Sequence, residues 1–328
     1  MKTSRRKALQ RIGGGLLAVA AFGSGNVDAQ ASYPDRPVRI VVPYPAGGSL
    51  DLVARTIAEK LGRQWPRPII VENRPGASGM IGADVVAKAA PDGYTLLLTV
   101  SSVVQTPYMS AKPLFDPMRD LVPVTDICTT NMVLAAGAAG PRTLAEAVRI
   151  AKQEPGKLVY ATYGLGSGSH LYMEVFGSAA GISLTHAPYK GEMPIVNDLV
   201  GGQIAMGTLS PMVVRQHMRG GKLTPLAVSG DARAPLLPDV PTFEELGYRG
   251  LSGPSWLGMF TTRGTPQPVV EKVAADVAAV LAAPDVRQRL ADLGLNVRTS
   301  TPAAFAKVAK ADQAYWSEVI RKHNIRLD

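Results

Sequence analysis

Several residue types are scarce in this chain, and their scarcity narrows its possible functions. Cysteine occurs once, as Cys128, so no disulfide can form within the chain and stability must come from a buried hydrophobic core. Cys128 lies in the apolar stretch 122–134, where we expect it to be a small buried hydrophobe. Aromatic residues make up only 6% of the chain, and no block of lysines and arginines alternates with them. Nucleic-acid binding therefore has little support.

Motifs of the common enzyme classes are also missing. A G-x-S-x-G nucleophile elbow would need a serine with a glycine two positions before it and another two positions after it. Ser78, Ser167, Ser169 and Ser252 all lack at least one of these glycines. The dinucleotide fingerprint G-x-G-x-x-G begins at Gly164 but has serine at its last position. We therefore expect a protein that is not an enzyme and that has no nucleotide cofactor.

Metal-binding residues are few as well. The four histidines stand at positions 170, 186, 217 and 323. His170 and Glu174 are four residues apart on a predicted helix, but no third ligand accompanies them. We interpret them as a surface pair and expect no metal site.

The N-terminus has the three regions of an export signal. Residues 2–11 carry five lysines and arginines, and Ile12–Phe22 is apolar. Candidate cleavage sites with small residues follow, and cleavage would come after Ala29 or Ala31. The apolar run is shorter than the roughly 20 residues that span a bilayer. Ser4-Arg5-Arg6 resembles a twin-arginine signal, and a general secretory signal fits nearly as well. We expect residues 1–31 to be removed and the mature chain to be periplasmic.

The most informative stretch begins the mature chain and predicts a strand, a tight loop and a helix. Val38–Val42 is β-branched, as in a buried parallel strand. Gly47 and Gly48 allow a sharp turn, Ser49 is a good N-cap, and Asp51 in the first helical turn stabilises the helix dipole by about 0.3–1 kcal/mol. The exposed N–H groups of such a loop suit an anion, here a carboxylate. Taken alone, the loop fits better a turn that binds nothing, because most strand-to-helix turns are only turns.

Two further loops repeat this chemistry. The loop 76–79 follows the predicted strand 68–72, and Ser78 is a candidate N-cap for a helix over 79–89. The loop 164–170 is a third glycine- and serine-rich turn, and Ser102 follows the strand 95–100. Because adjacent parallel strands bring their loops to one edge of a sheet, the loops at 47–49 and 76–79 together indicate an anion site more strongly than either loop alone.

Segments along almost the whole mature chain carry a family resemblance. They are VRIVVPYPAGGSLDLVAR, ENRPGASGMIGADVVAKAAPDGYTLLL, HAPYKG, VNDLVGGQ, GGKLTPLAVSGDAR, LPDVPTFEELGY, GTPQPVV and LADLGLNVRTSTPAAFAK. In this order they resemble the tripartite tricarboxylate transporter solute receptors, the Bug family. The resemblance implies an α/β periplasmic binding protein of the type II arrangement, in which two lobes, each a mixed sheet flanked by helices, enclose a cleft. Lobe 1 would comprise 32–132 and 253–328, and lobe 2 would comprise 133–252.

The resemblance also implies ligand-binding positions. The family's two proximal loops match 44–51 and 76–79, its lobe-2 loop matches 164–170, and its Pro-Tyr-Lys-Gly motif matches 188–191. With the strand-end serine and the strand after Gly-Gly-Gln, the expected ligand contacts are Tyr44, Ala46, Gly47, Gly48, Ser49, Ser78, Gly79, Ser102, Gly166, Ser167, Ser169, Tyr189 and Leu209.

The implied ligand is a small carboxylate, and the implied partners are the membrane subunits of a tripartite permease, served by a monomeric receptor. Many members carry an acidic residue on the strand after Gly-Gly-Gln, where this chain has Ala205 and Leu209. Without an acidic group to bind an ammonium, we expect a di- or tricarboxylate or an aromatic acid, not an amino acid. The alternative function is a sensor that presents the bound solute to a membrane signalling protein.

Overall fold

The computed structural model describes residues 33–251 and 255–327. The predicted export signal, residues 1–31, lies outside this part of the chain. From Pro34 onward the chain forms one unit with two separate β-sheets.

The first sheet is mixed and has six strands in the order β11-β4-β10-β3-β1-β2. Its strands are β1 (Val38–Val42), β2 (Ile69–Asn73), β3 (Thr95–Val100), β4 (Leu121–Thr130), β10 (Ser255–Thr262) and β11 (Asn296–Val297). β1 pairs in parallel with both β2 and β3, whereas β10 runs antiparallel to β3 and β4. The loops that leave β1, β2 and β3 therefore lie at one edge of this sheet.

The second sheet is also mixed, with five strands in the order β7-β6-β8-β5-β9. Its strands are β5 (Val133–Ala136), β6 (Val159–Thr162), β7 (Thr185–Pro188), β8 (Met206–Leu209) and β9 (Thr224–Val228). β6 is parallel to β7 and to β8, so the loops after these three strands also share an edge.

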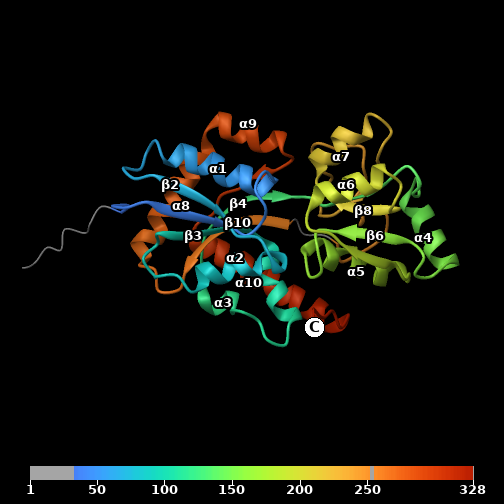
Figure 1. Cartoon of the computed structure of the whole chain (residues 1–328), viewed down its shortest axis with the longest axis horizontal. Helices are drawn as coiled ribbons and strands as arrows, with labels where there is room; N and C mark the ends of the chain where they lie inside the picture. Colours follow the sequence, from blue (N-terminus) through green and yellow to red (C-terminus); the bar gives the residue numbers. More distant parts are fainter. Residues whose placement is uncertain (1–32, 252–254, 328) are drawn as a thin grey trace, which may run out of the picture. The chain divides into compact units, whose positions relative to one another are not determined.

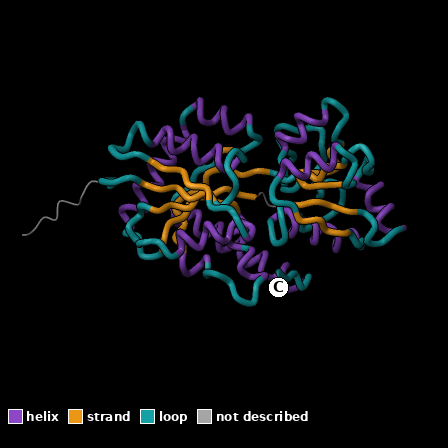
Figure 2. Tube along the Cα trace, viewed as in Figure 1, coloured by secondary structure: helices purple, strands orange, loops and turns teal. Residues whose placement is uncertain are grey.

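Helices flank both sheets (Figures 1 and 2). They are α1 (Ser49–Leu61), α2 (Met80–Ala87), α3 (Pro117–Asp120), α4 (Leu144–Gln153), α5 (Gly168–Ala180), α6 (Glu192–Val200), α7 (Pro211–Met218), α8 (Gln267–Ala282), α9 (Pro284–Asp292) and α10 (Pro302–Lys322), with short 3₁₀ turns at Ala77–Gly79, Ser101–Val104 and Thr106–Met109. Among the described residues, no helix combines the length and the apolarity that a membrane crossing requires.

These two helix-flanked mixed sheets confirm the expected two-lobe α/β fold. The chain leaves the first sheet after Thr130 and returns to it at Ser255, and the residue limits of the lobes stay a prediction. Cys128 is completely buried in β4, as expected.

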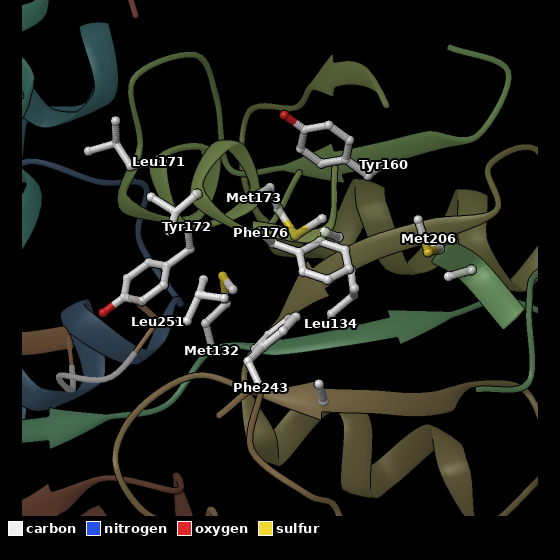
Figure 3. Close-up of a cluster of buried hydrophobic side chains, with 14 of the residues drawn as sticks. Met132, Leu134, Tyr160, Leu171, Tyr172, Met173, Phe176, Met206, Phe243 and Leu251 are labelled. Atoms are coloured by element: carbon white, nitrogen blue, oxygen red, sulfur yellow. The ribbon is translucent and has the colours of Figure 1, made fainter. Parts of the chain in front are cut away.

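Helix α10 belongs to the cores of both lobes. Phe305 and Ala309, near its start, pack into the first core beside Trp256. Trp316 and Ile320, two to three turns later, join the second core, whose centre is drawn in Figure 3. Tyr172 of α5 contacts Trp316 there edge to face, with ring centroids 5.2 Å apart. One continuous helix therefore connects the two hydrophobic cores.

Candidate ligand-binding site

The loop-bearing edges of the two sheets meet each other. Ser78 Oγ, after β2, donates to the carbonyl oxygen of Leu165, after β6, at 2.7 Å. Thr106 Oγ1 donates to the carbonyl oxygen of Gly166 at 2.9 Å. These two hydrogen bonds join the loop after β2 and the 3₁₀ turn that begins at Thr106 to the glycine-rich loop after β6.

The first loop, between β1 and α1, is held by Asp51, whose side chain is only 2% exposed. Asp51 Oδ2 accepts from Gly47 N–H and from Arg55 Nε, both at 2.9 Å, and Oδ1 accepts from Asn73 Nδ2 at 3.0 Å. Burial by itself raises the pKa of this carboxyl, but the hydrogen bonds from Arg55, Gly47 and Asn73 outweigh burial and lower it. Asp51 is thus an ionised anchor for the loop.

The helix after this loop begins one residue earlier than the sequence predicts. Ser49 is the first helical residue and not the N-cap, which is Gly48, and no side chain caps the helix. Ala46, Gly47 and Gly48 are exposed. The Gly47 amide is engaged by Asp51, but within residues 33–251 and 255–327 no group accepts from the amides of Gly48 and Ser49. These two N–H groups remain for an anion at the helix N-terminus.

Tyr44 connects three loops at the first-lobe edge. Its hydroxyl donates to the carbonyl oxygen of Ser78 at 3.2 Å and lies 3.1 Å from Ser102 Oγ. Burial raises the pKa of this phenol, so it stays protonated. Gly79 packs on the ring, because a Cβ there would lie 3.1 Å from Tyr44 Oη. Four of the predicted positions are therefore in direct contact.

The second loop is strained. Ala77 and Ser78 have φ values of 46° and 53°, a left-handed conformation that costs non-glycine residues of order 1–3 kcal/mol each. The expected capping role of Ser78 is wrong: α2 begins at Met80 with Gly79 as N-cap, and the Ser78 hydroxyl binds Leu165 instead. The Gly79 amide donates to Gly76, whereas in the described chain the amides of Ala77 and Ser78 have no acceptor. A strained loop with two available N–H groups indicates a functional turn.

The third loop, in the second lobe, is ordered by its own side chains. Ser167 caps α5 by accepting from His170 N–H at 3.3 Å, and its hydroxyl donates to the Gly164 carbonyl at 2.7 Å. Ser169 Oγ lies 3.0 Å from Ser167 Oγ, and Gly166 N–H donates to His170 Nδ1 at 3.2 Å. The loop is therefore preformed.

Two predicted positions point away from these loops. The Tyr189 hydroxyl donates to Asp198 Oδ2 at 2.5 Å, and this bond raises its pKa to about 12. Leu209 is completely buried and belongs to the core packed by Ile195 and Leu199. The structure thus places the side chains of Tyr189 and Leu209 against α6 and in the second-lobe core.

Comparison with known proteins identifies the family of this chain. Residues 53–325 match the family model described as "Tripartite tricarboxylate transporter family receptor". The chain belongs to this receptor family. It is 35% identical to the periplasmic binding protein BugD, with a TM-score of 0.82 over 90% of this chain and 99% of that one. It is also similar to a structure from R. palustris solved with adipate (31% identity, TM-score 0.83, 90% and 99% covered) and to MatC from Rhodopseudomonas palustris with bound malate (32%, 0.80, 88% and 100%).

These receptors are solute-binding proteins and not an enzyme family, and the family is periplasmic. Among the described residues of this receptor, no three metal-ligating side chains cluster. The charged residue that sequence reasoning missed is Glu192, at the start of α6. Its Oε1 accepts from Tyr163 Oη at 3.4 Å and from the Ser210 amide, and burial raises its pKa. Many members of the family carry an acidic residue on the strand that corresponds to β8. In this receptor the acidic residue, Glu192, follows β7 instead.

The receptor's second-lobe loop rests on a pair of histidines, which corrects the interpretation of His170 as part of a surface pair. His170 is 6% exposed and stacks on His186, with ring centroids 4.1 Å apart. His186 Nε2 lies 2.6 Å from Thr162 Oγ1. Burial lowers the pKa of both histidines to about 4, and for His186 the neighbouring His170 adds to the effect.

We expect this pair to make the receptor less stable as the pH falls from 6.5 to 4. In that range histidines of the unfolded chain become protonated, whereas the two folded histidines, with their lower pKa, stay neutral. The free energy of unfolding therefore falls. Asp126 and Asp312, whose pKa burial raises to about 6, act in the opposite direction. We therefore compare the change in the free energy of unfolding between pH 7 and pH 4.5, measured by urea unfolding, in the wild type and in His170→Asn. The asparagine keeps an acceptor for Gly166 N–H. The wild type should lose about 2 kcal/mol more than the variant. An equal loss in both would contradict the prediction, and His217→Asn is the control.

Proposed function

We propose that this receptor captures a small carboxylate between its two lobes and delivers it, as a monomer, to the membrane subunits of a tripartite permease. The observation that carries the proposal is the pair of neighbouring turns after β1 and β2, where the amides of Gly48, Ser49, Ala77 and Ser78 have no acceptor among the described residues. Two helix-associated turns with unpaired N–H groups suit the two oxygens of a carboxylate. The adipate and malate in the related structures support the same ligand class.

The location belongs to the same proposal. The family is periplasmic, and we infer that residues 1–31 are the signal that exports this chain. Because lobes that close on a ligand need a hinge, we assign the trapping motion to the β4–β5 and β9–β10 crossings. The Ser78–Leu165 bond then joins the lobes on the ligand side.

The test is a thermal-shift screen of the mature chain against a carboxylate library of aliphatic mono-, di- and tricarboxylates, aromatic acids and amino acids. A true ligand at 100 times its Kd adds about 2.7 kcal/mol to the free energy of unfolding, which raises Tm measurably. The amides of the same acids are the matched control, since they keep the shape and lose the charge. If no carboxylate raises Tm above its amide, the proposal is refuted.

Transport is distinguished from sensing in a deletion strain. We expect uptake of the identified solute to fall when the gene is removed and to return when it is restored. Unchanged uptake together with lost induction of the solute's catabolic genes would favour the sensor instead.

A further inference from the structure

Glu192 lies at the loop-bearing edge of the second sheet. Tyr163 follows β6, Glu192 follows β7, and Ser210 follows β8, and these strands are parallel. All three residues are therefore at one edge of the second sheet. The same edge presents the carbonyl groups of Leu165 and Gly166 to the first lobe.

The hydrogen bonds of Glu192 leave part of its carboxylate available. Oε1 accepts both from Tyr163 Oη and from the Ser210 amide, and within the described chain no residue donates to Oε2. Neither a lysine nor an arginine of the described residues forms an ion pair with it. The Ser210 hydroxyl beside it is buried, and it lowers the pKa of the Glu192 carboxyl but does not outweigh the effect of burial. A half-buried carboxylate without a cation is costly unless a donor from elsewhere completes its hydrogen bonds.

Glu192 also occupies a position that an anion would otherwise take. Ser210 is the N-cap residue of α7, so its amide lies at a helix N-terminus, where negative groups are attracted. The side chain of Glu192 already accepts the hydrogen bond of this amide. A ligand carboxylate arriving at the same place would find a negative charge and no free donor from Ser210 N–H.

We propose that Glu192 is the specificity-determining residue of the cleft: it selects acids whose far end carries a hydrogen-bond donor, an ammonium above all, and it rejects a second carboxylate. The inference rests on the proposed function, in which the first lobe holds the ligand's carboxylate. It changes the expected ligand class, since the acidic group absent from β8 is supplied by the start of α6. The solute is then a small monocarboxylate with an amino group, or more weakly a hydroxyl group, opposite its carboxylate.

The experiment compares ligands of equal length by calorimetry on the mature chain. ω-Amino acids, ω-hydroxy acids, plain monocarboxylates and dicarboxylates are matched in chain length, from γ-aminobutyrate and glutarate upward. A hydrogen bond to a charged group is worth about 1.5–3 kcal/mol, so at the best length the amino acid should bind about tenfold to a hundredfold more tightly than the dicarboxylate. In Glu192→Gln, which keeps an acceptor for Ser210 N–H, this preference should fall at least about tenfold. Glu154→Gln, at an exposed glutamate of the same lobe paired with Lys157, is the matched control and should change nothing.

Each outcome decides the proposal. A wild type that binds the dicarboxylate as tightly as the amino acid overturns it without any variant, and so does a Glu192→Gln protein that keeps the wild-type preference. Both results leave the proposed function intact, because a carboxylate is still bound. Failure of every acid, with no heat and no shift in Tm, refutes the proposed function itself.

Discussion

Replacing Gly48 by valine should abolish carboxylate binding and leave the fold almost unchanged. Gly48 has φ −78° and ψ 168°, an ordinary extended conformation, and a Cβ at this position would meet only the Pro45 carbonyl oxygen, at 3.8 Å. The protein therefore has room for the side chain. The ligand does not, because the valine methyl groups would cover the amides of Gly48 and Ser49. We expect affinity to fall more than about a hundredfold, which is about 2.7 kcal/mol of binding free energy.

The control for this variant is Gly220→Val. Gly220 lies in the turn after α7, and a Cβ there would make only ordinary contacts, with Lys222 Cγ at 3.9 Å and the His217 carbonyl oxygen at 4.0 Å. The measurements are calorimetric affinity for the best acid and urea unfolding of both variants, in which neither should lose more than about 1 kcal/mol of stability. Gly47 and Gly79 are unsuitable for this test, since their φ values of 83° and 94° would strain any side chain. If Gly48→Val still binds within threefold of the wild type, the first loop does not hold the ligand.

Local patterns in the sequence were sufficient to predict the elements that carry the site. The β-branched run 38–42 forms β1, the glycines after it form an exposed turn, and the apolar stripe that follows is α1. Parallel pairing of β1 with β2 and β3 brings their loops to one edge, as alternating strands and helices predict. These features depend on neighbours in the sequence, so the sequence displays them.

Contacts between distant residues were not predictable in the same way. Ser78 looks like an N-cap from its neighbours, but its hydroxyl bonds to Leu165 in the other lobe. His170 of α5 looks like a surface residue from the sequence, but His186 of strand β7 stacks on it. Glu192 begins a helix, as many exposed glutamates do, and only the folded chain places Tyr163 and Ser210 around it. In each case the deciding partner lies on another element.

Replacing Asp51 by alanine should have the largest effect on stability among the site variants. The change removes the acceptor of the Gly47 amide and one of the two acceptors of Asn73 Nδ2, at a residue that is 2% exposed. Leaving buried donors unsatisfied costs about 1–3 kcal/mol for each group, and loss of a buried charge partner adds to this. We expect the free energy of unfolding at pH 7 to fall by about 3 kcal/mol, and binding to weaken because the first loop is released.

Three comparisons separate the anchoring role of Asp51 from a general loss of charge. Asp51→Asn keeps one acceptor oxygen and should lose about half as much stability as Asp51→Ala. Asp285→Ala removes an exposed acid paired with Lys60 and should change stability by less than about 1 kcal/mol. The pKa of Asp51 is lowered in the folded protein, so its contribution is complete above the unfolded value of about 3.9 and is lost as the pH falls through the folded value. The gap between wild type and Asp51→Ala should therefore be constant from pH 8 to pH 5 and shrink below pH 4. A gap no larger than that of Asp285→Ala at pH 7 would mean that the loop keeps its shape without Asp51, and the amides of Gly48 and Ser49 would then owe their orientation to the glycine backbone itself.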